Sequence, residues 1–482
     1  MSHFYSILFA WFGMVAAGLF YVGAYLPISI SVCILLCISL YMYSEYRRKR
    51  LGVLLMLYWL VYALPFIHIP PYLFFDFSTD PEKLWGLSVN PYMLDKQVIE
   101  LTAMIGAVGG LGIAFGISLV SKPLQKSAIL HSDGSQPLYH TMSTSIWIIW
   151  LAVGVVLTAL SAPSQTIFTA RYSQSLSSLD GSNFDSAWMM SYVCLTFAFC
   201  DALFERNYAI RRTKMFMMSI ALFFVVVFYQ FLRGDRDCVP WVFGLSLAYY
   251  NWAASVTQRQ GFRISWSKVV GVAIVLVGVS QMIGEIRSAL PSKATIADVV
   301  EVVGFLYESG IIGLGNALHG TWSAVLLTPL SVAGDEVYSL LDVKNGEDYL
   351  NLFLSIVPGF LADAIGYVRP IDSNSGPAWE MRYGLGGTHA TVLPFRNFQM
   401  LGVFVIPAIW ASILVMYERF ALEKISVNRV SLLITLAMVS PHWLWYGEKN
   451  GFNGVVICLG LMVLYRISIG VSASSFERRR IT

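Results

Sequence analysis

The chain has 482 residues, of which 56% are hydrophobic and only 13% are charged, and its formal net charge at pH 7 is +3. Soluble domains carry about 25% charged residues, so this composition excludes an ordinary soluble protein and indicates a membrane protein. The sequence has no basic patch with interleaved aromatic residues, which argues against a nucleic-acid partner.

Twelve apolar segments approach the length of about 20 residues that a helix needs to cross a bilayer. In chain order they are 4–22, 26–43, 51–68, 98–120, 144–162, 187–204, 214–232, 238–254, 268–284, 397–417, 429–446 and 451–468. Long apolar runs form helices in a membrane because every backbone polar group must find its partner within the segment. We therefore predict an all-α polytopic membrane protein with about 12 transmembrane helices.

The charges between these segments indicate how the chain is oriented. If both termini are cytoplasmic and each span crosses once, 20 of the 32 basic residues lie inside, including those of 46–50, 205–214 and 477–480. Of the 29 acidic residues, 22 lie outside. Cytoplasmic loops are enriched in Lys and Arg. The distribution therefore predicts an even number of spans with cytoplasmic N- and C-termini.

One connection, residues 285–396 on the predicted outer face, is too long to be a simple loop. Within it, 297–310 carries apolar residues at helical spacing, which predicts an amphipathic helix. The stretch 349–366 is apolar but short and contains Pro358, so we expect a helix at the membrane interface and not another span. The Gly- and Pro-rich stretch 366–394 is expected to be irregular.

The chain is accordingly divided into three parts. These are 1–284, a bundle of about nine spans; 285–396, the large outer loop with interfacial helices; and 397–482, the last spans with a cytoplasmic tail.

No nucleotide-binding, zinc-protease or serine-hydrolase signature is present in the sequence. The six cysteines form no CxxC pair, and no cluster of aspartates suggests a metal site. We therefore expect neither a cofactor nor a metal.

Arginine on the predicted outer face is the main chemical signal. Outer loops should be poor in Arg, yet seven are expected there: Arg171, Arg233, Arg236, Arg287, Arg369, Arg382 and Arg396. The planar guanidinium donates two parallel hydrogen bonds and stays charged, which suits a phosphate or diphosphate. The alternative for the hairpin at 233–237 is that its two arginines and two aspartates only neutralise one another.

Two segments carry a resemblance. The stretch 223–252 has Gly234 and Arg236 as a G-x-R step between two apolar runs, and 384–409 is a Gly-rich polar stretch with Gly387 and His389 that leads into a span. Both segments, together with one large outer loop late in the chain, resemble the Wzy-type O-antigen or oligosaccharide repeat-unit polymerases of bacteria. The acidic position of the family's second pattern is replaced near Arg396, which leaves the general base open.

The resemblance implies a GT-C-like fold in the bacterial inner membrane with an active site that faces the periplasm. It implies a metal-independent glycosyltransferase that moves a growing glycan from undecaprenyl diphosphate to the non-reducing end of a lipid-linked repeat unit. Arg236, His389 and Glu380 are the expected catalytic residues, and the other outer arginines are expected to bind the diphosphate. A lone His in such a loop is more often structural, and a lone Glu is more often solvated or paired with an arginine.

The implied partners are the undecaprenyl-diphosphate-linked oligosaccharide, membrane lipids, and a chain-length regulator and flippase of the same pathway. Two alternatives stay open. An O-antigen ligase would use the same donor, and a transporter or flippase would carry the same lipid-linked oligosaccharide.

Overall fold

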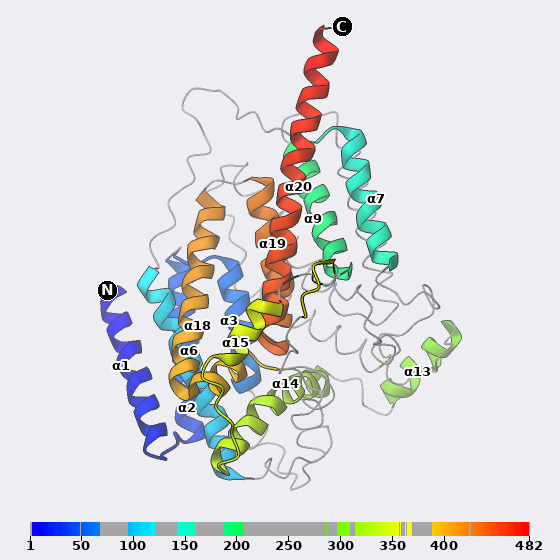
Figure 1. Cartoon of the computed structure of the whole chain (residues 1–482). Coiled ribbons are helices and arrows are strands. Elements are labelled where there is room, and N and C mark those ends of the chain that lie inside the picture. The colour runs from blue at the N-terminus through cyan, green and yellow to red at the C-terminus, as the bar shows by residue number, and fades with distance from the viewer. Residues whose placement is uncertain are drawn as a thin grey trace. The chain divides into compact units, whose positions relative to one another are not determined.

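The computed structural model describes residues 2–48, 50–67, 95–120, 142–160, 187–206, 286, 296–308, 314–355, 357, 362, 364–368, 388–423 and 426–481. All regular elements among these residues are helices (Figure 1). Nine of the twelve predicted spans coincide with helices. The other three, 214–232, 238–254 and 268–284, lie outside the described residues.

Five described helices are long and apolar enough to cross a membrane. They are α1 (Ser2–Tyr21), α2 (Ile28–Arg47), α6 (Lys96–Val120), α18 (Val392–Glu423) and α20 (Glu448–Ile481). Helices α3 (Val53–Ile67), α7 (Thr144–Leu160) and α9 (Ala187–Arg206) have shorter apolar segments, Leu54–Ile67, Thr144–Thr158 and Met189–Leu203. Helix α19 (Val427–Tyr446) has 20 residues. The protein is thus an α-helical, multi-pass membrane protein.

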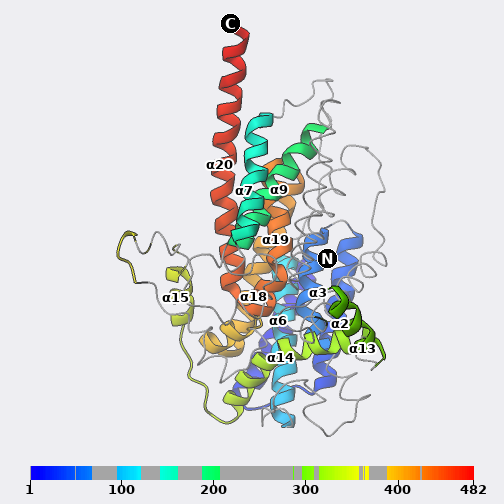
Figure 2. The same ribbon diagram turned by 90° about the vertical axis from the view of Figure 1, so that its right-hand side faces the viewer.

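The described residues of the predicted outer loop include three further helices. Its amphipathic stretch forms α13 (Ile296–Glu308), in which Leu306 is buried, and the stretch that contains Pro358 begins with the nine-residue α15 (Glu347–Ser355). The 24-residue α14 (Leu314–Val337) was not anticipated. Its sequence contains Pro329 and several polar residues, so it shows no span-like hydropathy. Figure 2 shows the three helices from a second side.

The chain forms two compact units. Unit 1 comprises residues 1–125, 319–422 and 440–452, and unit 2 comprises 126–318, 423–439 and 453–482. The predicted division at residues 284 and 396 describes membrane topology and stays a prediction.

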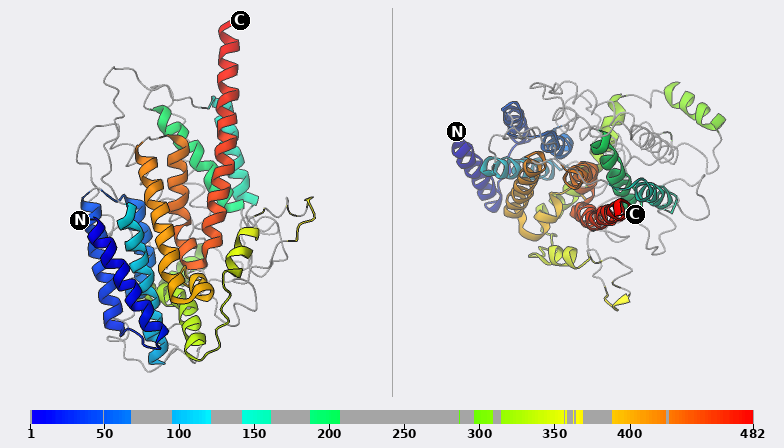
Figure 3. Two further views of the ribbon diagram at one scale, coloured as in Figure 1. Left: turned by 60° about the vertical axis from the view of Figure 1, so that its left-hand side comes forward. Right: turned by 90° about the horizontal axis from the view of Figure 1, so that it is seen from above.

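In unit 1, α6 is the central helix, and nearly all of its side chains are buried. Glycines let its neighbours approach closely. A Cβ on Gly112 or Gly116 would lie 2.1 Å from the carbonyl oxygen of Phe404 or Ala408 in α18, and one on Gly106 would meet the ring of Phe66 in α3. Small residues at such positions are the usual basis of close helix packing in membranes. Helices α1, α2, α3 and α18 therefore pack against α6. Figure 3 shows these helices from two further directions.

The two ends of the unit 1 bundle differ in charge. At one end, Glu418 of α18 accepts hydrogen bonds from the backbone N–H groups of Gly52 (3.0 Å) and Leu54 (2.9 Å), and Arg419 donates to the carbonyl oxygen of Val120 (2.9 Å). This basic end also carries Arg47, Arg48 and Arg50. The opposite, acidic end carries Asp95, Glu336, Asp342, Asp348 and Glu448. Helix α3 thus runs opposite to α6 and α18.

Unit 2 contains α7, α9 and most of α20. The indole of Trp147 donates to the carbonyl oxygen of Ala198 (2.9 Å), which ties α7 to α9. The buried carboxylate of Asp201 accepts from the hydroxyl of Tyr465 (2.6 Å) in α20 and from the backbone N–H of Met142 (3.2 Å). Both hydrogen bonds end on Oδ1 of Asp201, so this buried oxygen joins α20 to the residues that precede α7.

Helix α18 is broken near its start. Phe398 (φ −139°, ψ 16°) and Gln399 (φ 50°, ψ −143°) leave the helical conformation. The break separates a short arm, residues 392–397, from a long arm, residues 400–423. The short arm stands at the acidic end of unit 1, where it holds two of the residues singled out below.

Candidate functional site

Two of the predicted site residues, His389 and Arg396, are described by the structure, and both lie at the acidic end of unit 1. Seven others lie outside the described residues: Arg171, Arg233, Arg236, Arg287, Arg369, Glu380 and Arg382. Their grouping around a diphosphate therefore stays a prediction.

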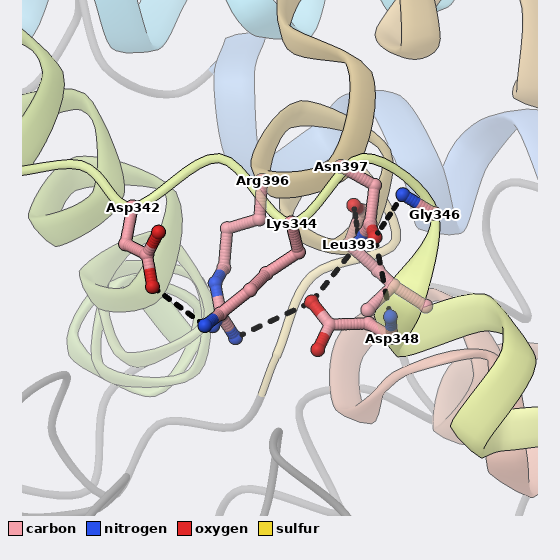
Figure 4. Close-up of polar contacts among 7 residues, drawn as sticks. All are labelled: Asp342, Lys344, Gly346, Asp348, Leu393, Arg396 and Asn397. Atoms are coloured by element: carbon pink, nitrogen blue, oxygen red, sulfur yellow. Dashed lines mark hydrogen bonds and ion pairs between the residues drawn. The ribbon is translucent and has the colours of Figure 1, made fainter.

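Arg396 lies on the short arm of α18, and only 7% of it is exposed. Its guanidinium Nη1 lies 3.7 Å from Oδ2 of Asp348, whose own side chain is almost fully buried (Figure 4). A buried charge is costly unless it is paired. Asp348, in the first turn of α15, therefore holds the arginine that the sequence pattern singled out.

Asn397 joins the same two segments, although the sequence pattern did not identify it. Its side-chain Oδ1 accepts the backbone N–H groups of Gly346 (3.0 Å) and Asp348 (3.3 Å). Its Nδ2 donates to Oδ2 of Asp348 (3.0 Å) and to the carbonyl oxygen of Leu393 (2.9 Å). The amide thus fills all four of its hydrogen-bonding positions and caps the beginning of α15 (Figure 4).

Lys344 brings a second cation to this cluster. Its backbone N–H donates to the carbonyl oxygen of Arg396 (2.9 Å), and its Nζ pairs with Oδ2 of Asp342 at 2.5 Å. The hydrogen bond that Lys344 donates to Asp342 raises the pKa of Lys344, so the ammonium stays charged at neutral pH. Figure 4 shows the ammonium and the guanidinium next to each other, with Asp342 on one side and Asp348 on the other.

We call Asp342, Lys344, Asp348, Arg396 and Asn397 the short-arm cluster. Carboxylate and phosphate oxygens accept hydrogen bonds from the same N–H donors. The Lys344 ammonium and the Arg396 guanidinium, which now pair with carboxylates, can therefore bind a phosphate oxygen in their place. The cluster is therefore suited to recognise an anion at the acidic end of the bundle.

An aromatic contact extends the cluster toward α20. The ring of Tyr349 stacks on Phe398 at the break of α18, with ring centroids 6.1 Å apart, and its hydroxyl donates to Oε1 of Glu448 (3.2 Å). Burial, and then the nearby Glu448 carboxylate, raise the pKa of Tyr349 well above its usual value. The hydroxyl therefore stays protonated and remains a hydrogen-bond donor.

His389 precedes the short arm and is fully buried. Its ring lies between Tyr62 (centroid distance 5.3 Å) and Phe66 (4.9 Å) of α3, and its Nδ1 lies 3.0 Å from the hydroxyl oxygen of Thr391. Burial lowers the pKa of His389 to about 3, and the Tyr62 carbonyl opposes this shift only weakly. Among the described residues, Nε2 has no hydrogen bond of good geometry. This environment favours the structural role over that of a general base.

The break in α18 lies beside the cluster. Gln399 has a positive φ, which is uncommon for a residue with a side chain, and such conformations cost about 1–3 kcal/mol. Gly346, in the loop before α15, has φ +94°, and a Cβ added to it would lie only 3.2–3.5 Å from atoms of the Phe398 ring. Glycine therefore suits both the backbone conformation and the close approach of this loop to the ring. Strained backbone of this kind is concentrated at functional sites.

An apolar groove with a volume of about 430 Å³ lies between α1, α2 and α6 in unit 1. Its walls include Phe9, Phe12, Cys33, Ile34 and Leu111. Because no charged residue lines it, the groove suits hydrocarbon and does not extend the polar site.

Comparison with protein-family models, curated proteins and solved structures finds no match to this chain. Among the described residues there is also no group of three or more His, Cys, Asp or Glu side chains that could hold a metal ion.

Proposed function

We propose that the protein is a bacterial inner-membrane polysaccharide polymerase of the Wzy type. In this proposal it transfers a growing glycan from undecaprenyl diphosphate to the non-reducing end of a lipid-linked repeat unit at the periplasmic face. The observation that carries the proposal is the short-arm cluster, in which Arg396 is held nearly buried beside Lys344 at one end of a membrane-length helix.

The chemistry explains why such a cluster would be useful. The acceptor hydroxyl oxygen forms a bond to the anomeric carbon, and the bond from that carbon to the diphosphate oxygen breaks. The diphosphate leaves with the electron pair, so its negative charge grows in the transition state. Fixed N–H donors aimed at that charge stabilise it without having to reorganise. Arginine and lysine meet this demand.

The charges at the ends of unit 1 support the orientation in this proposal. The basic end, with Arg47, Arg48, Arg50 and Arg419, would face the cytoplasm, and the acidic end with Arg396 would face the periplasm. The opposite directions of α3 and α18 agree with spans that cross alternately.

The remaining roles stay with residues outside the described part of the chain. Arg236 would contact the donor diphosphate, supported by Arg233, and the other outer arginines would bind the same group. The acceptor proton needs a base with a suitable pKa. Glu380 is a better candidate than His389, because the pKa of about 3 makes the buried imidazole a weak base.

One observation favours a second candidate, a flippase or transporter of the same lipid-linked oligosaccharide. Transporters often build their substrate sites from discontinuous membrane helices, and α18 is interrupted at Phe398 and Gln399. A ligase that uses the same donor would differ from the polymerase only in its acceptor.

A reconstituted assay distinguishes these activities. Purified protein in liposomes receives an undecaprenyl-diphosphate-linked oligosaccharide in the outer leaflet, and glycan length is followed by gel electrophoresis. A polymerase yields a ladder of longer glycans and free undecaprenyl diphosphate. Movement of unchanged substrate to the inner leaflet would identify a flippase, and a donor that stays intact in the outer leaflet would refute both activities.

The arginine is tested in the same assay. Arg396→Lys keeps the charge but loses the planar fork, so we expect at least tenfold slower glycan extension. Arg419→Lys, on the same helix at the basic end, is the matched control and should keep the activity. Thermal unfolding of both variants separates a loss of chemistry from a loss of folding. Normal glycan extension by a folded Arg396→Lys variant would show that the reaction does not need the Arg396 guanidinium, and would contradict the role proposed for the short-arm cluster.

A further inference from the structure

Helix α15 presents an apolar stripe that the other described parts of the chain leave largely exposed, although the ring of Phe353 meets that of Phe452 edge-on, with ring centroids 5.4 Å apart. Leu350, Phe353 and Leu354 are exposed by 60%, 53% and 41%, and their spacing of three and four residues puts them on one side of the helix. Asp348, Leu352 and Ser355 are buried on the other side. In most amphipathic helices of soluble proteins the apolar side faces the core, whereas in α15 it faces outward.

The protein holds this helix at a defined level along α18. Its first turn is fixed to the short arm through Asp348 and Asn397, and Tyr349 stacks on Phe398 at the break. Helix α15 thus lies beside the point at which the long arm of α18 begins.

The long arm carries an exposed apolar stripe of its own. Its exposed members recur every three or four residues: Leu401, Val405, Ile409, Ile413, Met416 and Phe420. On a helix that is long and apolar enough to cross a membrane, such a stripe faces lipid. Phe398, also exposed, stands at the beginning of this stripe and contacts Tyr349, the neighbour of Leu350. The α15 stripe therefore continues the lipid-facing surface of α18.

The length of α15 determines how it can meet the bilayer. Nine residues of helix extend about 14 Å, which is half of the hydrocarbon thickness of about 30 Å. Its first residue is the exposed Glu347, and Asp342 lies five residues before it in the preceding loop. A short helix with an outward apolar stripe and a charged beginning is suited to lie in the interface between headgroups and acyl chains.

We propose that α15 is an interfacial membrane helix, with Leu350, Phe353 and Leu354 inserted among the acyl chains at the acidic end of unit 1. The insertion fixes the short-arm cluster at the depth of the lipid headgroups. Arg396 then stands where the phosphate of a lipid lies, whichever lipid-linked reaction the protein catalyses. The proposal depends on the membrane location of the protein and not on its transferase activity.

Site-directed spin labelling tests the insertion. Single cysteines replace Leu350, Phe353 or Leu354 in a cysteine-free background, and the full-length protein is reconstituted in lipid nanodiscs. Asn345→Cys, exposed in the loop just before α15, is the matched control. Collision rates of the nitroxide with oxygen, which dissolves in lipid, and with a water-soluble nickel chelate report the depth of each label.

We expect labels at 350, 353 and 354 to collide at least fivefold less with the nickel chelate than the label at 345, and more with oxygen. Equal access of the chelate to all four positions would place the stripe in water and overturn the proposal. Protection from both reagents would overturn it as well, because another protein surface and not lipid would then cover the stripe.

Discussion

Asn397 and Asp348, 49 residues apart in the chain, bind each other through two hydrogen bonds in opposite directions. The side-chain Nδ2 of Asn397 donates to Oδ2 of Asp348 at 3.0 Å, and its Oδ1 accepts the backbone N–H of Asp348 at 3.3 Å. Both residues are buried. The pair fixes the beginning of α15 to the short arm of α18 and thereby sets where Arg396 lies.

Replacement of Asn397 by Leu should destabilise the protein. Leucine has nearly the same size but leaves the N–H groups of Gly346 and Asp348 without their acceptor, and each such loss costs about 1–3 kcal/mol. The change should lower the thermal unfolding midpoint in detergent, whereas Gln97→Leu, at an exposed position in the first turn of α6, should change it little. Equal midpoints for Asn397→Leu and Gln97→Leu would contradict the assigned role of Asn397.

Replacement of Gly112 by Ala should separate α6 from α18. The added Cβ would lie 2.1 Å from the backbone carbonyl oxygen of Phe404, which cannot move without its helix. We expect a loss of about 1–3 kcal/mol in the free energy of unfolding. Gly18→Ala in α1 is the control, since no atom lies within 4 Å of its Cβ, and it should be neutral or stabilising by up to about 1 kcal/mol. Urea-dependent unfolding in micelles compares the two variants.

Replacement of Glu418 by Gln should weaken the start of α3. Oε2 of Glu418 accepts from Gly52, and Oε1 accepts from Leu54, so both carboxylate oxygens are used. Glutamine has one acceptor oxygen, so one buried N–H loses its partner at a cost of about 1–3 kcal/mol. Hydrogen exchange should accelerate in the first turn of α3, and Glu301→Gln on exposed α13 should leave that turn unchanged. Unchanged hydrogen exchange in Glu418→Gln would mean that the two hydrogen bonds to the Glu418 carboxylate do not stabilise the start of α3.

The hydrogen bond between Tyr338 and Asp95 should make stability depend on pH. The tyrosine hydroxyl donates to Oδ2 at 2.5 Å and lowers the pKa of Asp95 below its usual value. A carboxyl group with a lowered folded pKa contributes stability above its unfolded pKa of about 3.9, and the contribution is lost as the pH falls through the folded pKa. The difference in unfolding midpoint between wild type and Tyr338→Phe should be constant from about pH 7 to 5 and shrink below about pH 4. A pH-independent difference would show that the carboxylate charge is not involved.

The two ends of unit 1 should lie on opposite sides of the membrane. In a cysteine-free background, Asn345→Cys should react with an impermeant maleimide in intact spheroplasts, and Arg48→Cys should react only after the membrane is opened. The same labelling pattern at both positions, or the reverse pattern, would refute the predicted orientation.

Composition and the spacing of apolar residues were enough to determine the class of this protein. The shortage of charge predicted a membrane protein, and helices occur at every predicted span within the described residues. The apolar spacing of 297–310 likewise predicted α13. These features are local, because a helix that buries or exposes one side along its length shows this periodicity in its own residues.

The candidate site was decided by tertiary contacts. No local pattern distinguishes Asn397 from other asparagines, since all of its partners except the carbonyl oxygen of Leu393 lie in the loop before α15 and at its start, 49 to 51 residues away. His389 looked like a candidate base in a polar loop, but Tyr62 and Phe66, more than 300 residues away in the chain, enclose it and keep it neutral. Arg396 was found from its type and place in the sequence, whereas its pairing with Asp348 required the fold. Burial and hydrogen-bond partners depend on which distant segments meet, and the sequence of one segment does not contain that information.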